Sequence, residues 1–173
     1  NEFDLKTLAI VNEKSESETA SELWKSLQEG LIIPLGEVYK FFHESESIEV
    51  ANTQDLLVAY RFLHDRVQQA AYFLIPEAEK QSTHLKIGQL LLRNIPLGER
   101  EENIFDIVNQ LNIGAELIES QTERDELAQL NLIAGVKAKN STAYAAAVKY
   151  LAAGRKLLAT NSWQQQYDLS LSL

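Results

Sequence analysis

The sequence predicts a mainly α-helical protein, in which a small winged-helix domain with a short β-hairpin precedes an array of antiparallel helices. Three observations support this fold class. Apolar residues recur at helical spacing through most of the 173 residues, two short runs of β-type residues occur only in the first half, and strand signals end at Pro76. We therefore expect one domain over residues 1–76 and a second over residues 77–173.

Two helices are expected before the first strand. The apolar residues between positions 3 and 11 suit a short helix, and Ser15 and Glu18 have the spacing of a capping box that begins a second one. Gly30 would end the second helix by taking a positive φ. Its apolar face would consist of Ala20, Leu23, Trp24 and Leu27.

The pattern then changes to two short strands. Residues 31–35 (LIIPL) and 56–64 (LLVAYRFLH) are rich in β-branched and aromatic residues. The polar connection over residues 36–55 is too long for a tight hairpin turn, so it would form the wing. Asp65 would then cap a third helix, with Gln68 three residues later, and this helix would end before Pro76.

After Pro76 only helices are expected, and residues 123–159 predict an antiparallel pair joined near Asn140. The pair resembles a degenerate tetratricopeptide (TPR) unit, although Asn131 stands where that repeat has an aromatic residue. The plain alternative is any antiparallel helix pair. The residues that fit the TPR-like packing, as small side chains at helix contacts or as an aromatic between helices, are Gly135, Ala138, Tyr144, Ala147 and Gly154.

Composition disfavours several classes of protein. The net charge of −9, from 25 acidic and 16 basic residues, opposes binding to a nucleic-acid backbone. The absence of cysteine suits a reducing compartment, and neither a signal peptide nor a membrane-spanning run is evident, so a cytoplasmic fragment of a longer protein is the expectation. Neither membrane nor nucleic acid is an expected partner.

No catalytic or metal-binding motif is recognisable. His43, His64 and His84 lack the spacing of a metal site, so we expect no metal. A nucleophile elbow, a catalytic cysteine and a glycine-rich phosphate loop are all absent from the sequence. The segment is therefore not expected to be an enzyme or to hold a cofactor by itself.

Three stretches are distinctive: YRFLHDRVQQAAYFLIPEAEKQSTHLKIGQLLL, IFDIVNQLNIGAELI and LAQLNLIAGVKAKNSTAYAAAVKYLAAG. They closely resemble the region that follows the ATPase module in large cyanobacterial multi-domain sensor kinases. Those proteins join a serine/threonine protein kinase domain, a signal-transduction ATPase with numerous domains (STAND, an AAA-type module), sensor modules and a histidine kinase. The resemblance implies a two-component signalling protein that binds ATP or ADP with magnesium in its ATPase module. It also implies that this chain contacts the adjacent ATPase and kinase domains and offers its helical arm to a protein partner.

The same resemblance suggests a role for His64. In the MHD motif of NB-ARC switch proteins, a histidine contacts the β-phosphate of bound ADP, and here Leu63, His64 and Asp65 would correspond to that motif. His64 would sense the nucleotide and Asp65 would cap the helix. A purely structural junction is the other interpretation of His64, and a DNA-binding winged-helix regulator is the alternative function. The acidic helix after Ser15 argues against DNA binding.

Overall fold

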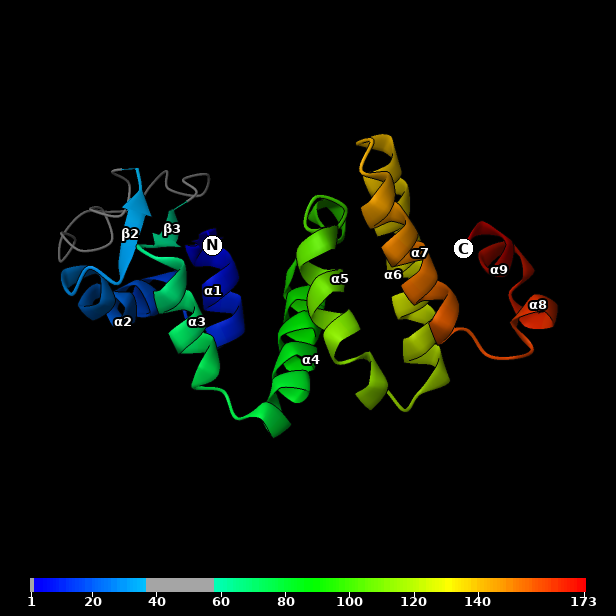
Figure 1. Ribbon diagram of the computed structural model, residues 1–173, viewed down its shortest axis with the longest axis horizontal. Helices are drawn as coiled ribbons and strands as arrows, with labels where there is room; N and C mark the ends of the chain where they lie inside the picture. Colours follow the sequence, from blue (N-terminus) through cyan, green and yellow to red (C-terminus); the bar gives the residue numbers. More distant parts are fainter. Residues whose placement is uncertain (1, 37–57) are drawn as a thin grey trace. The chain divides into compact units, whose positions relative to one another are not determined.

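The computed structural model describes residues 2–36 and 58–173, which form two compact units that divide between Glu77 and Ala78. The predicted wing lies almost entirely outside the described residues, as does His43. The first unit contains β1 (Glu2–Asp4), α1 (Leu5–Asn12), α2 (Glu16–Gln28), β2 (Ile32–Leu35), β3 (Ala59–Phe62) and α3 (Asp65–Phe73). The remaining helices are α4 (Glu77–Asn94), α5 (Ile104–Ile113), α6 (Gln121–Asn140), α7 (Tyr144–Leu157), α8 (Ser162–Gln165) and α9 (Tyr167–Ser172), with 3₁₀ turns at Leu97–Glu99 and Ala115–Leu117. The described chain is thus mainly helical, as predicted (Figure 1).

The sheet of the first unit has three antiparallel strands among the described residues, in the order β1-β3-β2. The two expected strands are present as β2 and β3, with Ile32 opposite Phe62 and Leu35 opposite Ala59. The prediction of helix from residue 3 was wrong, because residues 2–4 pair with β3 and Phe3 lies opposite Tyr60. A helix follows at once, since the Asp4 side chain accepts a hydrogen bond from the Thr7 backbone N–H and so caps α1.

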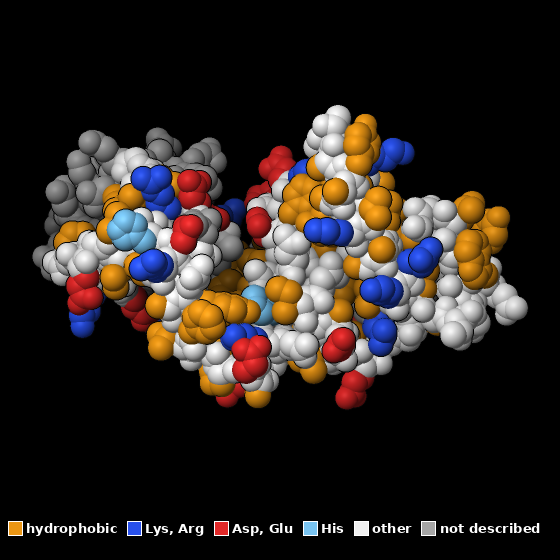
Figure 2. All heavy atoms as spheres, viewed as in Figure 1, with side chains coloured by type: hydrophobic (Ala, Val, Ile, Leu, Met, Phe, Trp, Pro, Cys, Tyr) orange, Lys and Arg blue, Asp and Glu red, His pale blue; other side chains and the backbone are white. Residues whose placement is uncertain are grey.

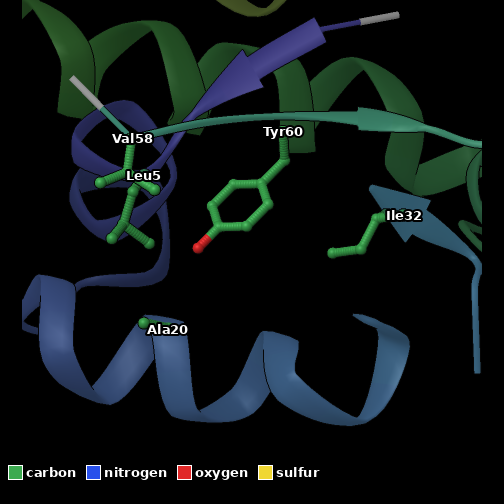
Figure 3. Close-up of a cluster of buried hydrophobic side chains, with 5 residues drawn as sticks. All are labelled: Leu5, Ala20, Ile32, Val58 and Tyr60. Atoms are coloured by element: carbon green, nitrogen blue, oxygen red, sulfur yellow. The ribbon is translucent and has the colours of Figure 1, made fainter. Parts of the chain in front are cut away.

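The core of the first unit forms around Tyr60 of the central strand. Tyr60 is fully buried and points toward α2, where Ala20 provides room for the ring (Figure 3). Phe3 stacks on Tyr60 with ring centroids 5.8 Å apart. The other buried members are Leu5, Ile32 and Val58, and Leu23 and Leu27 pack against them. Trp24, which was expected in this core, is 39% exposed.

The ends of α2 form as the sequence predicts. Ser15 accepts a hydrogen bond from the Glu18 backbone N–H, and the Glu18 carboxylate accepts one from the Ser15 backbone N–H, so the capping box is complete. Gly30 takes a φ of +67° after the helix, which a side chain would oppose. The tight turn leads the chain directly into β2.

The second unit consists of helices that pack through glycines. A Cβ atom added at Gly88 of α4 would lie 2.7 Å from the Leu111 side chain of α5. One added at Gly135 of α6 would lie equally close to the Leu151 side chain of α7. Because both pairs make such close contacts, each forms a tight helix pair. Ile104, Val108 and Ala134 form a buried cluster where α5 meets α6.

A pair of asparagines joins α5 to α6. The Asn112 side chain donates a 2.9 Å hydrogen bond to Asn131 Oδ1, and the Asn131 side chain donates one of the same length to Asn112 Oδ1. Asn131 Nδ2 also donates to the Leu127 carbonyl at 2.9 Å, and its side chain is fully buried. Both amides are therefore satisfied inside the helix contact, and the pair fixes the register of α5 on α6.

We predict opposite outcomes for two substitutions of Tyr60. No described residue accepts or donates a hydrogen bond at its buried hydroxyl, and burial raises the pKa of this phenol. Tyr60→Phe should leave the free energy of unfolding within about 1 kcal/mol or raise it, because the ring stays and an unpaired polar group is removed. Tyr60→Ala should lower it by about 3–5 kcal/mol, because the ring fills the core. Chemical denaturation measures both, and a large loss in Tyr60→Phe would show that the hydroxyl is bonded.

We also predict that the two asparagines stabilise the second unit jointly. Asn112→Ala and Asn131→Ala should each cost about 2 kcal/mol, because each leaves a partner amide unpaired. The double variant should cost less than the sum, with a coupling free energy of about 1 kcal/mol in a double-mutant cycle. Gln129→Ala, at an exposed position of the same helix, is the control and should change little. Additive losses would contradict the amide pair.

Candidate functional site

The candidate sensing site is the corner between β3 and α3. Phe62, the last residue of β3, packs against the core of the first unit and lies 5.4 Å from the Phe3 ring. The backbone N–H of Leu63 donates a 3.0 Å hydrogen bond to the Leu31 carbonyl, which ties the corner to the start of β2. The corner is thus held by the core on one side and by backbone hydrogen bonding on the other.

His64 occupies the N-cap position of α3. Its backbone is extended (φ −139°, ψ 146°), its carbonyl accepts a hydrogen bond from the Val67 N–H at 2.9 Å, and its side chain is exposed. The side chain makes no capping bond to the helix. An imidazole in this position is available to a ligand, and the positive end of the helix dipole lies beside it.

Asp65 is the first residue of α3 and not its cap, so the predicted capping role was wrong by one residue. The reason is that the extended conformation falls at His64, and the cap is the residue that still has non-helical dihedral angles. A carboxylate in the first turn nevertheless stabilises a helix through the dipole. Asp65 therefore favours the same helix start by a different interaction.

His84 takes part in a contact between two helices. His84 of α4 lies 2.6 Å from Gln110 of α5, measured from Nδ1 to Oε1, so it forms part of a helix contact in the second unit. No group of three or more histidine and acidic side chains within residues 2–36 and 58–173 is arranged to hold a metal ion. Over the same residues, no helix combines the length and apolarity needed to cross a bilayer.

Four of the five residues chosen for TPR-like packing lie at the contact between α6 and α7. Gly135, Ala138, Ala147 and Gly154 are buried. A Cβ atom at Gly154 would lie 3.1 Å from Asn131 Cβ and 3.2 Å from the Ala128 carbonyl, so the close approach of the helices requires glycine. Tyr144 was expected between the helices but is 63% exposed, at the first residue of α7.

The surface of α2 is acidic and held in place by local hydrogen bonds. The Ser15 side chain and backbone hold the pKa of Glu18 below its usual value. Hydrogen bonds from the Lys14 and Asn12 side chains do the same for Glu22. Both carboxylates are therefore ionised at neutral pH, and this helix would repel a phosphate backbone.

Sequence reasoning missed one lysine that organises the second unit. The Lys137 ammonium donates hydrogen bonds to the backbone carbonyls of Glu101 (2.6 Å) and Glu102 (3.1 Å). It also lies 5.5 Å from the centre of the Phe105 ring, a cation–π contact. The turn before α5 is thereby fixed to α6. No local motif marks this role, because the acceptors are backbone carbonyls far away in the sequence.

Comparison with known proteins gives one informative similarity. The chain is 38% identical over 130 residues to hybrid signal transduction histidine kinase G of Dictyostelium discoideum. The match covers 66% of this chain but 4% of the length of that kinase. No protein-family model and no solved structure matches the chain. The chain is therefore similar to a small segment of a signal-transduction histidine kinase.

Proposed function

We propose that this chain is a non-catalytic regulatory and interaction segment of a multi-domain signalling ATPase–kinase. In this function it couples the nucleotide state of an adjacent ATPase module to a helical arm that binds protein. The observation that carries the proposal is the similarity to a signal-transduction histidine kinase, of which a segment this size is a small fraction. Such a segment need not contain the catalytic groups of the parent.

The first unit would be the winged-helix part of the switch. Its compact core, three-stranded sheet and short helices support this assignment, because together they form a rigid support for the β3–α3 corner. The second unit would be the start of a TPR-like arm. Its antiparallel α6 and α7, in contact through glycine and alanine, support that assignment.

His64 would sense ADP by donating a hydrogen bond to a phosphate oxygen. Its exposure at the start of α3, beside the positive end of the helix dipole, supports this role. A charge-assisted hydrogen bond of this kind contributes about 1.5–3 kcal/mol. A ligand shifts a two-state equilibrium only by its difference in affinity for the two states, so this contact would favour the ADP-bound, closed state by about that amount.

A DNA-binding function has less support. The helix that would enter the DNA groove is α2. This helix exposes Glu16, Glu18 and Glu22, and Lys25 is its one basic residue. Hydrogen bonds hold the pKa of Glu18 and of Glu22 on this same helix below the usual value, so its charge persists at neutral pH.

We predict that His64→Ala weakens ADP binding in the full-length protein that carries the ATPase module. Loss of a contact of about 1.5–3 kcal/mol corresponds to a dissociation constant roughly 10- to 150-fold higher. ATP affinity should change less, because the contact belongs to the closed state. Equilibrium titration with a fluorescent ADP analogue measures the first effect, and phosphorylation output measures its consequence for signalling.

The matched control is Gln69→Ala, at an exposed position of the same helix, which should leave ADP affinity unchanged. His64→Arg places another hydrogen-bond donor at this position and should retain part of the affinity. Equal ADP affinity in the wild-type, His64→Ala and Gln69→Ala proteins would rule out nucleotide sensing by His64.

A further inference from the structure

The charge of the chain is unevenly distributed, and the segment that contains α7 has basic residues without acidic ones. Between Glu126 and Asp168 the sequence contains no acidic residue but has five basic ones, although the whole chain has a net charge of −9. Three of the five, Lys149, Arg155 and Lys156, belong to α7, which has no acidic residue. Figure 2 shows Lys and Arg side chains among hydrophobic ones over this helix.

The exposed residues of α7 fall on one side of the helix, which we name the α7 face. Successive members are separated by three or four residues along two adjacent rows, so they align on one side of an α-helix. Lys149 and Lys156 are seven residues apart, which is about 10 Å along the helix. The α7 face consists of the exposed Tyr144, Ala145, Val148, Lys149, Arg155 and Lys156, with the half-buried Ala152 among them.

The side chains of the α7 face are not engaged elsewhere in the described chain. Lys149, Arg155 and Lys156 are exposed, and none forms a hydrogen bond or ion pair with a described residue. This distinguishes them from Lys137, whose ammonium is held by two carbonyls. Tyr144 and Val148 are 63% and 66% exposed. The face therefore combines unpaired cations with exposed apolar groups, a composition that favours a binding surface.

We propose that the α7 face binds an acidic amphipathic helix of a partner protein. The apolar row of the partner would cover Tyr144 and Val148, and carboxylates seven residues apart would reach Lys149 and Lys156. The small side chains of Ala145 and Ala152 would let the two helices approach closely. This inference rests on the proposed function, in which the helical arm binds protein, and it assigns the surface and the partner chemistry.

A protein helix fits this surface better than nucleic acid or an anionic membrane does. Three cations on one helix are few for a phosphate backbone or a lipid surface, and the net charge of −9 opposes approach to either. An acidic helix needs only a few complementary charges at close range. It also buries the apolar residues between them, which a phosphate backbone does not.

The test measures binding of a labelled synthetic peptide to the complete 173-residue chain by fluorescence anisotropy. The peptide is an amphipathic helix of about 18 residues, long enough to span α7, with leucine along one row and glutamate beside it. We expect binding that weakens at least about fivefold between roughly 50 and 500 mM NaCl, because charge attraction is screened. The same peptide with lysine in place of glutamate should not bind.

Two double variants with the same change in charge locate the surface. Lys149→Glu/Lys156→Glu should weaken binding at least about tenfold, because it reverses charge on the α7 face. Lys25→Glu/Arg66→Glu reverses two exposed cations in the first unit and should weaken it less than about threefold. Val148→Asp should also reduce binding strongly. Circular dichroism and thermal unfolding verify that each variant is folded.

Equal losses in the two double variants would overturn the proposal, since they would show a non-specific charge effect. Tighter binding to a DNA duplex or to phosphatidylserine vesicles than to the acidic peptide would overturn it too. The peptide assay contains no ADP or ATP. A chain that does not bind the peptide would therefore contradict the acidic partner helix but not ADP sensing by His64. Conversely, unchanged ADP affinity in His64→Ala would leave the peptide result standing.

Discussion

The helical unit depends on one buried polar contact, the reciprocal amide pair between Asn112 and Asn131. A fully buried amide is costly unless its donors and acceptor are bonded, so α5 and α6 are stable together only in the register that pairs the two side chains. A Cβ atom added at Gly154 of α7 would lie 3.1 Å from Asn131 Cβ, so α7 packs closely against this asparagine. The same asparagine therefore fixes α5 by hydrogen bonding and α7 by close packing.

Features specified by local sequence were predictable. The Ser15–Glu18 capping box, the positive φ of Gly30 and the strand at Ile32–Leu35 depend on neighbouring residues, and all three are present. β1 was missed because three residues are too few to show alternation, and their pairing with β3 is distant in sequence. The exposed fraction of a side chain was also hard to predict, because it depends on contacts with residues distant in sequence. Trp24 and Tyr144 have apolar side chains at helical spacing, but whether a neighbouring element covers them is a tertiary fact.

The candidate site was predictable only in part. The sequence indicates that His64 lies where a strand meets a helix, but its position as the N-cap, with Asp65 inside the helix, follows from backbone angles. Asn131 was noticed as a departure from the repeat pattern, yet its partner lies in a different helix pair. The basic character of α7 was concealed by whole-chain charge, which averages an acidic α2 and a basic α7 into a single negative number.

The two proposed functions are thermodynamically linked if the arm moves as one body. Lys137, Asn131 and Gly135 join α6 to the turn before α5, to α5 itself and to α7, so a partner helix bound to the α7 face would act on all of them together. The connection from α3 to α4 is short and ends in Pro76, whose ring restricts the backbone. The corner that carries His64 and the helical arm are therefore joined covalently through this connection. Linkage then requires that, if ADP changes the affinity for the partner helix by some factor, the partner helix changes the affinity for ADP by the same factor. A partner of the arm would thereby regulate nucleotide retention without touching the nucleotide.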